Sequence, residues 1–354
     1  MCSSFGLFYG KRVLEVEQVK SIPCAVFGAS GYSGVELVWL LHNHPQFSLE
    51  YAFSSSARED AEPIASLYPQ LAGQLDVILQ PWHSDLLSQL SQQVRVVFLA
   101  LPHEASAEIA PVLINAGLVV FDLSGAFRLR DPLAHQQAYG FERSADVPET
   151  IPYGLAEWAT LAGTEQLIAV PGCYPTVTSL ALKPVMPFID GVPMVNAVSG
   201  VSGAGRKAAS HTSFCEVSLA AYGVATHRHQ PEIAQAIDHD VIFVPHLGNF
   251  KRGILATIYV PLQQGTSQAM IDTAYQQAYS AEPLIRLRQQ PPAIRDVVGT
   301  AFCDIHPVVH QNHLVICAAI DNLLKGAAAQ AVQLANQYFD FDSTLGLQQR
   351  GGVV

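Results

Sequence analysis

The chain has 354 residues, of which 49% are hydrophobic and 14% are charged, and its formal net charge is -11 at pH 7. This length exceeds that of one typical domain, so we expect two domains with enough apolar residues for a sizeable core. The acidic balance argues against binding of nucleic acid or of an anionic membrane, because both require a basic face. A small-molecule ligand is therefore expected.

The cysteines are dispersed along the chain and include no CxxC pair, which indicates reduced thiols and a cytoplasmic protein. They are Cys2, Cys24, Cys173, Cys215, Cys303 and Cys317. No run of about eighteen apolar residues predicts a membrane-spanning helix. Residues 1–20 mix charges of both signs and lack the apolar segment of a signal peptide, so we expect them to form an N-terminal extension outside the fold.

The first part of the chain alternates between strand and helix patterns. An apolar strand is predicted over 22–27, and it is followed by the glycine-rich segment 28–34 and a helical pattern over 35–42. Further strands are predicted at 47–53, 94–100 and 118–123, and a further helix at 105–116. This alternation predicts an α/β fold with a Rossmann-like, doubly wound parallel sheet and helices on both faces.

Beyond Pro171 the predicted strands become longer and the alternation with helices is lost. The elements expected here are strands at 194–199, 241–244, 253–262 and 313–320 and a helix at 268–280. We expect an α+β domain with a mixed or antiparallel sheet. A final helix over 322–339 carries a wide apolar stripe that must pack on a core, and the first sheet is the natural partner.

The glycines between the first strand and the first helix predict a phosphate-binding turn. Glycine lets the backbone approach a ligand, and the helix N-terminus presents N–H groups and partial positive charge to a phosphate. The spacing is GxxGxxG rather than the GxGxxG typical of dinucleotide-binding turns, so a plain tight turn is the alternative. The candidate cofactor-binding residues are Gly28, Ser30, Gly31, Tyr32, Ser33 and Gly34.

The end of the next strand favours NADP over NAD. An NAD-binding protein places Asp or Glu about 20 residues beyond the turn, where the carboxylate binds the ribose. This strand instead ends in Ser54-Ser55-Ser56-Ala57-Arg58. Hydroxyl groups and a guanidinium suit a 2′-phosphate, so Ser54, Ser56 and Arg58 are candidates for that contact. A solvated serine turn is the alternative.

Cys173 lies in the run Val170-Pro171-Gly172-Cys173-Tyr174-Pro175-Thr176 and is the candidate nucleophile. Pro175 suits the first positions of a helix that continues through Leu182, so Cys173 is expected at the helix N-terminus. The N–H groups and partial positive charge there favour the thiolate and predict a lowered pKa. A buried cysteine that packs as a small hydrophobic residue is the alternative.

Two histidines, His227 and His229, precede a helix opened by Pro231 and are candidates for proton transfer to and from the reacting groups. A His-x-His pair could instead bind a metal, but zinc sites usually take three or four protein ligands. The remaining group, His306, His310 and His313, has ordinary neighbours. We therefore expect no metal site.

Two further segments carry candidate substrate-binding residues. Arg128 follows a strand of the first sheet, near the carboxyl edge where such sheets bind ligands, and could hold a phosphate or carboxylate. A surface ion pair is the alternative for this arginine. The glycine-rich loop 199–206 follows a strand of the second domain and offers Ser202, Gly203 and Arg206 to a substrate.

Seven motifs in this order resemble the N-acetyl-gamma-glutamyl-phosphate reductase family of arginine biosynthesis, from about residue 22 to residue 340. They are GASGYSG, LPHEAS, DLSGAFRL, VPGCYPT, SGVSGAGR, HRHQPEI and DNLLKGAAAQA. Aspartate-semialdehyde dehydrogenase, a more distant relative with the same cysteine chemistry, is the alternative. The VPGCYPT and HRHQPEI motifs favour the glutamyl enzyme over it.

The resemblance implies NADPH-dependent reduction of an acyl phosphate to a semialdehyde through a thioester on Cys173. It also implies an NADP-binding domain over 21–172, a substrate and dimerisation domain over 173–320, and a segment over 321–354 that returns to the first domain. Pro102 and Asn322 would bind the cofactor. The enzyme would be a homo-oligomer, a dimer or a tetramer.

The sequence departs from the family pattern at two positions, with Ala126 where Asp is usual and Ala329 where Gly is usual. Both lie near residues expected to set the position of Arg128 and the nicotinamide end of the cofactor. Two other classes of protein explain only part of the pattern. A cysteine hydrolase has no use for the glycine turn, and a non-catalytic NADP sensor has no use for an activated thiol.

Overall fold

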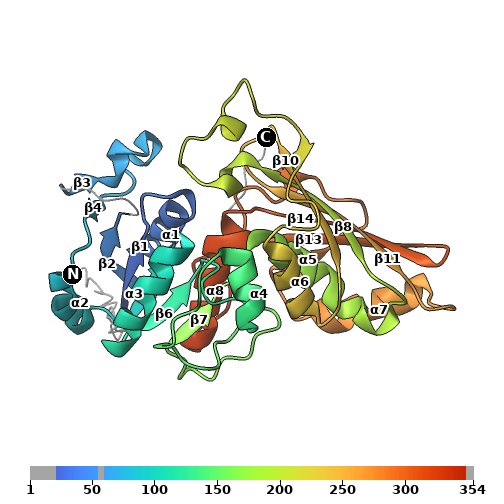
Figure 1. Cartoon of the computed structure of the whole chain (residues 1–354), viewed down its shortest axis with the longest axis horizontal. Helices are drawn as coiled ribbons and strands as arrows, with labels where there is room; N and C mark the ends of the chain where they lie inside the picture. Colours follow the sequence, from blue (N-terminus) through green and yellow to red (C-terminus); the bar gives the residue numbers. More distant parts are fainter. Residues whose placement is uncertain (1–20, 55–59, 348–354) are drawn as a thin grey trace, which may run out of the picture.

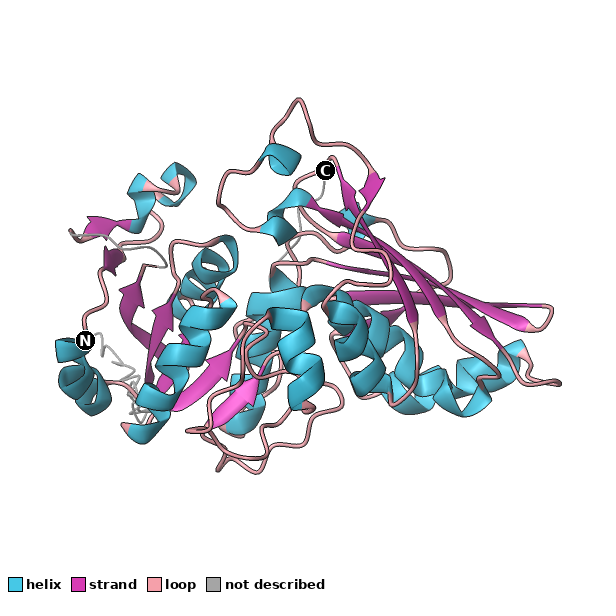
Figure 2. Ribbon diagram, viewed as in Figure 1, coloured by secondary structure: helices cyan, strands magenta, loops and turns pink. Residues whose placement is uncertain are grey.

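A computed structural model describes residues 21–54 and 60–347 of the chain. Two seven-stranded sheets lie next to each other, each with helices packed on it (Figure 1, Figure 2). The predicted N-terminal extension, residues 1–20, lies outside the described residues, as do Ser56 and Arg58.

The first sheet is parallel except at one edge, and its strand order is β3-β4-β2-β1-β5-β6-β7. Its strands are β1 (Ile22–Phe27), β2 (Phe47–Phe53), β3 (Glu62–Pro63), β4 (Ile78–Gln80), β5 (Val96–Leu99), β6 (Val119–Asp122) and β7 (Leu167–Ala169). The order reverses direction between β1 and β5, so the carboxyl ends of these strands flank the crevice where doubly wound sheets bind ligands. The predicted Rossmann-like domain is confirmed.

Helices cover both faces of the first sheet. They are α1 (Tyr32–His42), α2 (Leu87–Gln93), α3 (His103–Asn115) and α4 (Pro132–Tyr139) from the first part of the chain and α8 (Ala329–Tyr338) from its end. Buried side chains of α1 and α8 share one core with Val26 and Phe98, whereas those of α2 and α3 pack with Phe27 and Val97 on the opposite face. These arrangements bury the sheet on both sides, as its apolar strands require.

The second sheet is mixed, with the order β12-β13-β14-β11-β8-β10-β9. Its strands are β8 (Met194–Gly200), β9 (Ala220–Ala221), β10 (Ile242–Gly248), β11 (Ile254–Pro261), β12 (Ile285–Leu287), β13 (Cys303–His310) and β14 (His313–Ile320). The β8–β10 and β12–β13 pairs are parallel and the other pairs are antiparallel. This confirms the expected second sheet.

One face of the second sheet is covered by the helices α5 (Cys173–Leu182), α6 (His229–Ile237) and α7 (Gln268–Tyr279) (Figure 1). The core on that face includes Val177, Ile233 and Tyr275 from the helices and alternate residues of β11, such as Ile254 and Ile258. The intervening residues of the strands face away from these helices, because successive side chains of a strand point to opposite faces.

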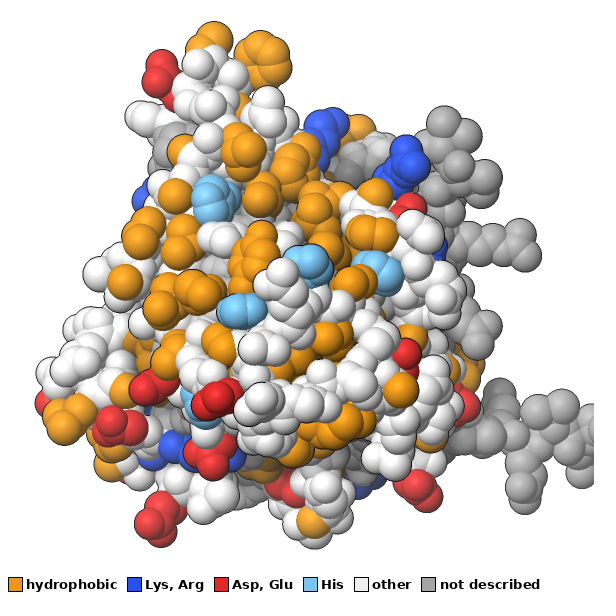
Figure 3. Space-filling model, turned by 90° about the vertical axis from the view of Figure 1, so that its right-hand side faces the viewer, with side chains coloured by type: hydrophobic (Ala, Val, Ile, Leu, Met, Phe, Trp, Pro, Cys, Tyr) orange, Lys and Arg blue, Asp and Glu red, His pale blue; other side chains and the backbone are white. Residues whose placement is uncertain are grey.

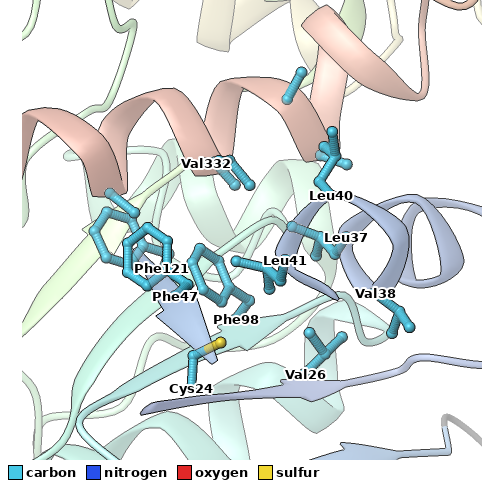
Figure 4. Packing of buried hydrophobic residues seen from close by; sticks show 14 of the residues in the cluster. Cys24, Val26, Leu37, Val38, Leu40, Leu41, Phe47, Phe98, Phe121 and Val332 are labelled. Carbon is cyan, nitrogen blue, oxygen red and sulfur yellow. The ribbon is translucent and has the colours of Figure 1, made fainter. Parts of the chain in front are cut away.

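The last helical segment returns to the first sheet, as its apolar stripe predicts. Val332 of α8 points toward Leu41 and Phe98 (Figure 4), and Val332, Leu334 and Ala335 are fully buried in the core of the first sheet. The segment is not one regular helix, however. A π-helical turn over Leu324–Ala328 precedes α8, so helical structure runs over 324–338, close to the predicted 322–339, and only the π-turn was not predicted.

α5 begins at Cys173, as expected, but the predicted starts of two other helices are too late by two or three residues. These helices begin at Tyr32 and His103, whereas the apolar patterns predicted starts at Val35 and Ala105. The first turn of each contains Gly, Pro or polar residues that mask a periodic pattern. Such residues are tolerated there because the first N–H groups of a helix have no partner within it.

Candidate active site

A cavity of about 660 Å³ lies between the two sheets and brings most of the predicted site residues together. Those that line it are Ser30, Gly31, Tyr32, Ser33, Pro102, Arg128, Cys173, Ser202, Gly203, Arg206, His229 and Asn322. Gly28 and Gly34 form the turn behind it, and Ser54 lies at the end of β2 without lining it. The cavity therefore runs from the glycine turn to the cysteine.

A second cavity of about 480 Å³ extends from Cys173 into the second sheet. His227 lines this cavity and not the first, together with Tyr174, Ser199 and Tyr222. Cys173, Gly203, Ala204, Arg228 and His229 line both cavities. The thiol thus lies where the two cavities meet, which suits a group that holds a ligand from one cavity next to a ligand in the other.

The turn between β1 and α1 can hold the phosphates of a dinucleotide. Gly28 has a φ of +84°, and a methyl group on it would lie 2.2 Å from the carbonyl oxygen of Ala100. A methyl group on Gly34 would lie 2.0 Å from the carbonyl oxygen of Gly28. Only glycine fits at either position. The first turn of α1 contains no acidic residue, so its N–H groups and partial positive charge remain available to an anion.

Asn322 connects the end of β14 to the loop that follows β8. Its Oδ1 accepts a hydrogen bond of 2.7 Å from the Gly253 N–H, and its Nδ2 donates one of 3.0 Å to Oγ of Ser202. Ser202 and Asn322 are therefore fixed together at the cavity wall. Arg206 lies farther out on the same loop, with its guanidinium 5.4 Å from the centre of the Tyr68 ring.

Cys173 is the first residue of α5, with Gly172 as the N-cap. The prediction of a lowered pKa is wrong for the protein by itself. Burial raises the pKa of Cys173 to about 11, although Arg128 and the N–H groups of Tyr174 and Cys173 act in the opposite direction. Desolvation of the thiolate outweighs the favourable charges at this helix N-terminus.

Gly172 allows two charged or polar side chains to lie beside the start of α5. A methyl group on Gly172 would lie 2.6 Å from Nε2 of His229 and 2.8 Å from Nη1 of Arg128. No other residue type fits there without displacing the imidazole or the guanidinium. The VPGCYPT motif therefore places a histidine and an arginine next to Cys173, because Gly172 has no side chain.

Glu232 is a fully buried carboxylate that holds this arrangement together. Its Oε1 accepts hydrogen bonds from the Gly172 N–H (2.8 Å) and the Tyr153 hydroxyl (2.9 Å). Its Oε2 lies 3.4 Å from Nη1 of Arg128 and 4.0 Å from Nε2 of His229. Sequence reasoning did not single out Glu232. The available signal was its position three residues after His229, which places both side chains on the same face of α6.

Arg128 is buried and already held by the protein on three sides. Its Nε donates to the carbonyl oxygen of Val170 (2.8 Å), its Nη2 to that of Leu123 (2.5 Å), and its Nη1 faces Glu232. A guanidinium has five N–H groups, so donors remain for a ligand in the cavity that Arg128 lines. The surface ion pair considered as an alternative is excluded.

Both predicted histidines are neutral near pH 7. Burial, followed by the charge of Arg228, lowers the pKa of His227 to about 4. Burial also holds the pKa of His229 well below its ordinary value, with His227 and Arg128 acting in the same direction. Nδ1 of His227 accepts a hydrogen bond of 3.1 Å from the His229 N–H, so a neutral His227 carries its proton on Nε2.

Comparison with known protein families agrees with this fold and site. Residues 23–164 match the NAD-binding domain of semialdehyde dehydrogenases, and residues 173–322 match the dimerisation domain of the same enzymes. A solved structure of aspartate semialdehyde dehydrogenase II from Vibrio cholerae has the same fold, with a TM-score of 0.67, 18% sequence identity, and coverage of 91% of this chain and 99% of that one. The fold and the two matched domains are those of a semialdehyde dehydrogenase.

Curated relatives define the family more narrowly. N-acetyl-gamma-glutamyl-phosphate reductase from Tolumonas auensis is 50% identical over 331 residues, which cover 91% of this chain and 98% of the relative. The enzyme of that name from Escherichia coli strain K12 is 52% identical over 330 residues, with the same coverage. The chain belongs to the N-acetyl-gamma-glutamyl-phosphate reductase family. The resemblance predicted from the seven motifs is confirmed.

The part of the chain that the structure describes contains neither a metal-binding cluster nor a membrane-spanning helix. Over 21–54 and 60–347, no group of three or more His, Cys, Asp or Glu side chains is arranged to hold a metal ion. In the same ranges, no helix has the length and apolar character needed to cross a membrane.

The raised pKa of Cys173 can be tested by alkylation of the protein alone. We expect the rate of labelling by iodoacetamide to rise about tenfold per pH unit between about pH 7 and about pH 9, because only the thiolate reacts and the pKa lies near 11. The Cys173→Ser variant, measured in parallel, corrects for labelling of the exposed Cys215. A rate that levels off below about pH 8 would show that the pKa is lowered instead.

Proposed function

We propose that the protein reduces N-acetyl-L-glutamyl 5-phosphate with NADPH to N-acetyl-L-glutamate 5-semialdehyde and phosphate, as a phosphorylating semialdehyde dehydrogenase of arginine biosynthesis. The observation that carries this proposal is the position of Cys173, at a helix N-terminus where the cavity from the glycine turn meets the cavity in the second sheet. Relatives at about half identity over nine tenths of the chain carry the name of this activity.

The first step is the transfer of the acyl group to Cys173. Sγ attacks the acyl carbon, the bond from that carbon to the phosphate oxygen breaks, and a thioester forms. Because the Cys173 thiol is protonated in the protein alone, its proton must move as the bond forms. His229 is neutral and lies beside Gly172, so it can take the proton and pass it to the departing phosphate.

When bound, NADPH supplies the hydride that reduces the thioester carbonyl. The N–H groups at the start of α5 stabilise the negative charge that develops on the carbonyl oxygen. Collapse of the resulting tetrahedral oxyanion re-forms the carbonyl and breaks the C–S bond, and the departing sulfur takes up a proton from water through His229, which restores the Cys173 thiol. Arg128 holds a phosphate or carboxylate group of the substrate through its remaining donors.

We assign the cofactor to the first cavity, which runs from the glycine turn to Cys173. Gly28, Ser30, Gly31, Tyr32, Ser33 and Gly34 hold the phosphates, and Pro102 and Asn322 contact the nicotinamide half. Ser54, Ser56 and Arg58 bind the 2′-phosphate, although two of these lie outside the described residues. A solved aspartate semialdehyde dehydrogenase from Candida albicans, at 16% identity and a TM-score of 0.63, is described with NADP.

We assign the substrate to the second cavity, which extends from Cys173 and is lined by Ser199, Tyr222 and His227. We place the acyl chain there. Gly203 lines this cavity, and Ser202 and Arg206 of the same loop, which line the first cavity, are the other proposed substrate-binding residues of the loop. The domain limits remain 21–172, 173–320 and 321–354. We place the enzyme in the cytoplasm, where its dispersed thiols stay reduced.

The decisive experiment is the reverse reaction in purified protein. Phosphate-dependent reduction of NADP is expected with N-acetylglutamate semialdehyde and to a far smaller extent with aspartate semialdehyde. Cys173→Ser should abolish turnover and leave NADP binding intact, because a serine hydroxyl is a much weaker acid and a poorer nucleophile than the thiol, so His229 cannot draw off its proton during attack. Higher kcat/KM with aspartate semialdehyde would contradict the substrate, and a Cys173→Ser variant with substantial activity would contradict the nucleophile.

The two histidines are expected to differ in their effects on the rate. His229→Asn should lower kcat by about a hundredfold or more, the range for a general acid/base group, because His229 lies beside Gly172 at the start of α6. His227→Asn should act mainly on the KM for the acyl phosphate. Steady-state kinetics of both variants decide the assignment, and a larger loss of kcat in His227→Asn reverses it.

The second sheet also supplies a surface for self-association, and we propose that the enzyme is a homodimer or a tetramer built on that dimer. Hydrophobic side chains gather on the end of the molecule formed by the second domain (Figure 3). Met194 of β8 and Tyr259 of β11 are paired in register, and both are about two fifths exposed on the face opposite the helices. Such an apolar sheet face is typical of a protein interface.

Charge at this face should separate the subunits. The double variant Met194→Glu/Tyr259→Glu is expected to be monomeric by light scattering at a concentration where the unmodified protein is dimeric, because four carboxylates would meet at a two-fold interface. Leu133→Glu on α4 is the control, since Leu133 is 68% exposed but belongs to the first domain. Dissociation by the control alone would place the interface elsewhere.

A further inference from the structure

A second buried ion pair, between Lys325 and Glu157, lies next to the segment that packs against Cys173. It has no role in the mechanism above. Nζ of Lys325 donates to Oε1 of Glu157, and both side chains are fully buried. Gln333 completes the group, because its Oε1 accepts from Lys325 (2.8 Å) and its Nε2 donates to Glu157 (3.0 Å). The ammonium and the carboxylate are therefore held by each other and by one amide.

Lys325 lies within the π-helical turn Leu324–Ala328. The Gly326 N–H donates to the carbonyl oxygen of Asp321 and the Ala328 N–H to that of Leu323, both at 2.9 Å and both five residues back. A π-turn inserts an extra residue into a helix and often marks a functional site. Here the extra residue changes which side chains of the segment face the cysteine.

The turn is packed directly against the nucleophile. A methyl group on Gly326 would lie 2.7 Å from Cβ and 3.1 Å from Cα of Cys173. Leu323, Gly326 and Ala327 also line the cavity that runs to the glycine turn. The residue that contacts Cys173 is thus the immediate neighbour of Lys325, so a shift of the lysine backbone would move the wall behind the thiol.

Glu157, the other member of the ion pair, lies on a loop that is connected to the surroundings of Cys173 at two points. Tyr153 of this loop donates to Glu232, which accepts the Gly172 N–H. Glu157, four residues later, binds Lys325, whose neighbour Gly326 contacts Cys173. One loop therefore fixes the residue before the nucleophile and the backbone packed against it.

Stability alone does not account for this ion pair. Removing two charges from water costs as much as their attraction returns, and apolar replacements of buried pairs are often neutral or stabilising. The best-attested use of such a group is to fix one register of a segment against another. The π-turn is a segment whose register matters, because an ordinary α-helical turn would present a different residue to Cys173.

We propose that Lys325 is a positioning residue for the reaction, whose ion pair with Glu157 fixes the π-turn so that Gly326 holds the Cys173 thiol in the geometry for attack. The proposal rests on Cys173 being the nucleophile. It requires no contact between Lys325 and the substrate or the cofactor.

The test compares the full-length protein with Lys325→Met, Glu157→Gln and the double variant. We expect Lys325→Met to lower kcat by about tenfold to a hundredfold, the effect of a small misplacement of reacting groups. The KM for the acyl phosphate and the Kd for NADP should stay within about threefold. The losses in the two single variants should not add in the double variant, because the residues act as one unit.

Alkylation of Cys173 by iodoacetamide provides a readout that does not depend on the substrate. The rate should not fall in Lys325→Met, because the thiol remains present and only its placement changes. Full activity of the unmodified protein with a different acyl phosphate would overturn the proposed substrate and leave this comparison valid. If the unmodified protein has no reductase activity and its Cys173 does not react with iodoacetamide, both proposals are overturned.

Arg286→Met is the matched control. It removes one of the two arginines, Arg286 and Arg288, that pair with Asp304, another fully buried carboxylate, and none of these residues lines the two cavities. We expect it to lower Tm with no change in kcat. An equal loss of kcat in this control, or kcat within about twofold of the unmodified protein in Lys325→Met, overturns the proposal.

If Lys325→Met does not fold, the variant Gln333→Met tests the positioning role of the ion pair instead. It keeps both charges and removes only the amide that holds them. We expect kcat to fall by a few fold, with the KM and the Kd for NADP unchanged. A soluble Gln333→Met variant with unchanged kcat, beside an insoluble Lys325→Met variant, would assign the ion pair to folding and overturn the positioning role.

Discussion

The hydrogen bond from the Gly172 N–H to the buried carboxylate of Glu232 is the interaction on which the site depends. It fixes the residue before Cys173 to α6, the helix that carries His229. The same carboxylate faces Arg128, which is bound to the carbonyl oxygens of Val170 and Leu123 in the first domain. One buried charge thus connects the segment that contains Cys173 with His229 and Arg128, and a buried charge keeps its place only when its partners are present.

The return of the chain to the first sheet gives this site its second wall. Asp321 directly follows β14, and its carboxylate accepts hydrogen bonds from the N–H groups of Leu323 and Leu324. It also forms an ion pair with Arg252, which forms a second ion pair with Glu36 on α1. The helix that begins at the glycine turn and the segment beside Cys173 are therefore linked through Arg252. A ligand bound at the glycine turn and a ligand bound at Cys173 meet on a surface to which both domains contribute.

The sequence predicted most of this fold from local patterns. The strands at 47–53 and 313–320 have the predicted bounds, and the glycine turn, the start of α5 near Cys173 and the returning helix are where the patterns placed them. Glu232, Tyr153 and the Glu157–Lys325 pair were not found, because each becomes meaningful only through partners that are distant in the sequence. A glutamate in a helix has the same local signal whether it is solvated or fully buried.

The predicted lowering of the Cys173 pKa is wrong because the free energy of desolvation is larger than that of the helix N-terminus effect. A helix N-terminus is worth about 0.3–1 kcal/mol to a nearby anion at an exposed site. Raising the pKa from 9.0 to about 11 corresponds to about 3 kcal/mol against the thiolate. Desolvation, which depends on the tertiary fold, therefore exceeds the local effect that the sequence reveals. In this buried site a thiol gains more from a neighbouring proton acceptor than from a helix N-terminus. The proposed reaction therefore needs the sulfur to lose its proton as the acyl carbon approaches and does not need a thiolate beforehand.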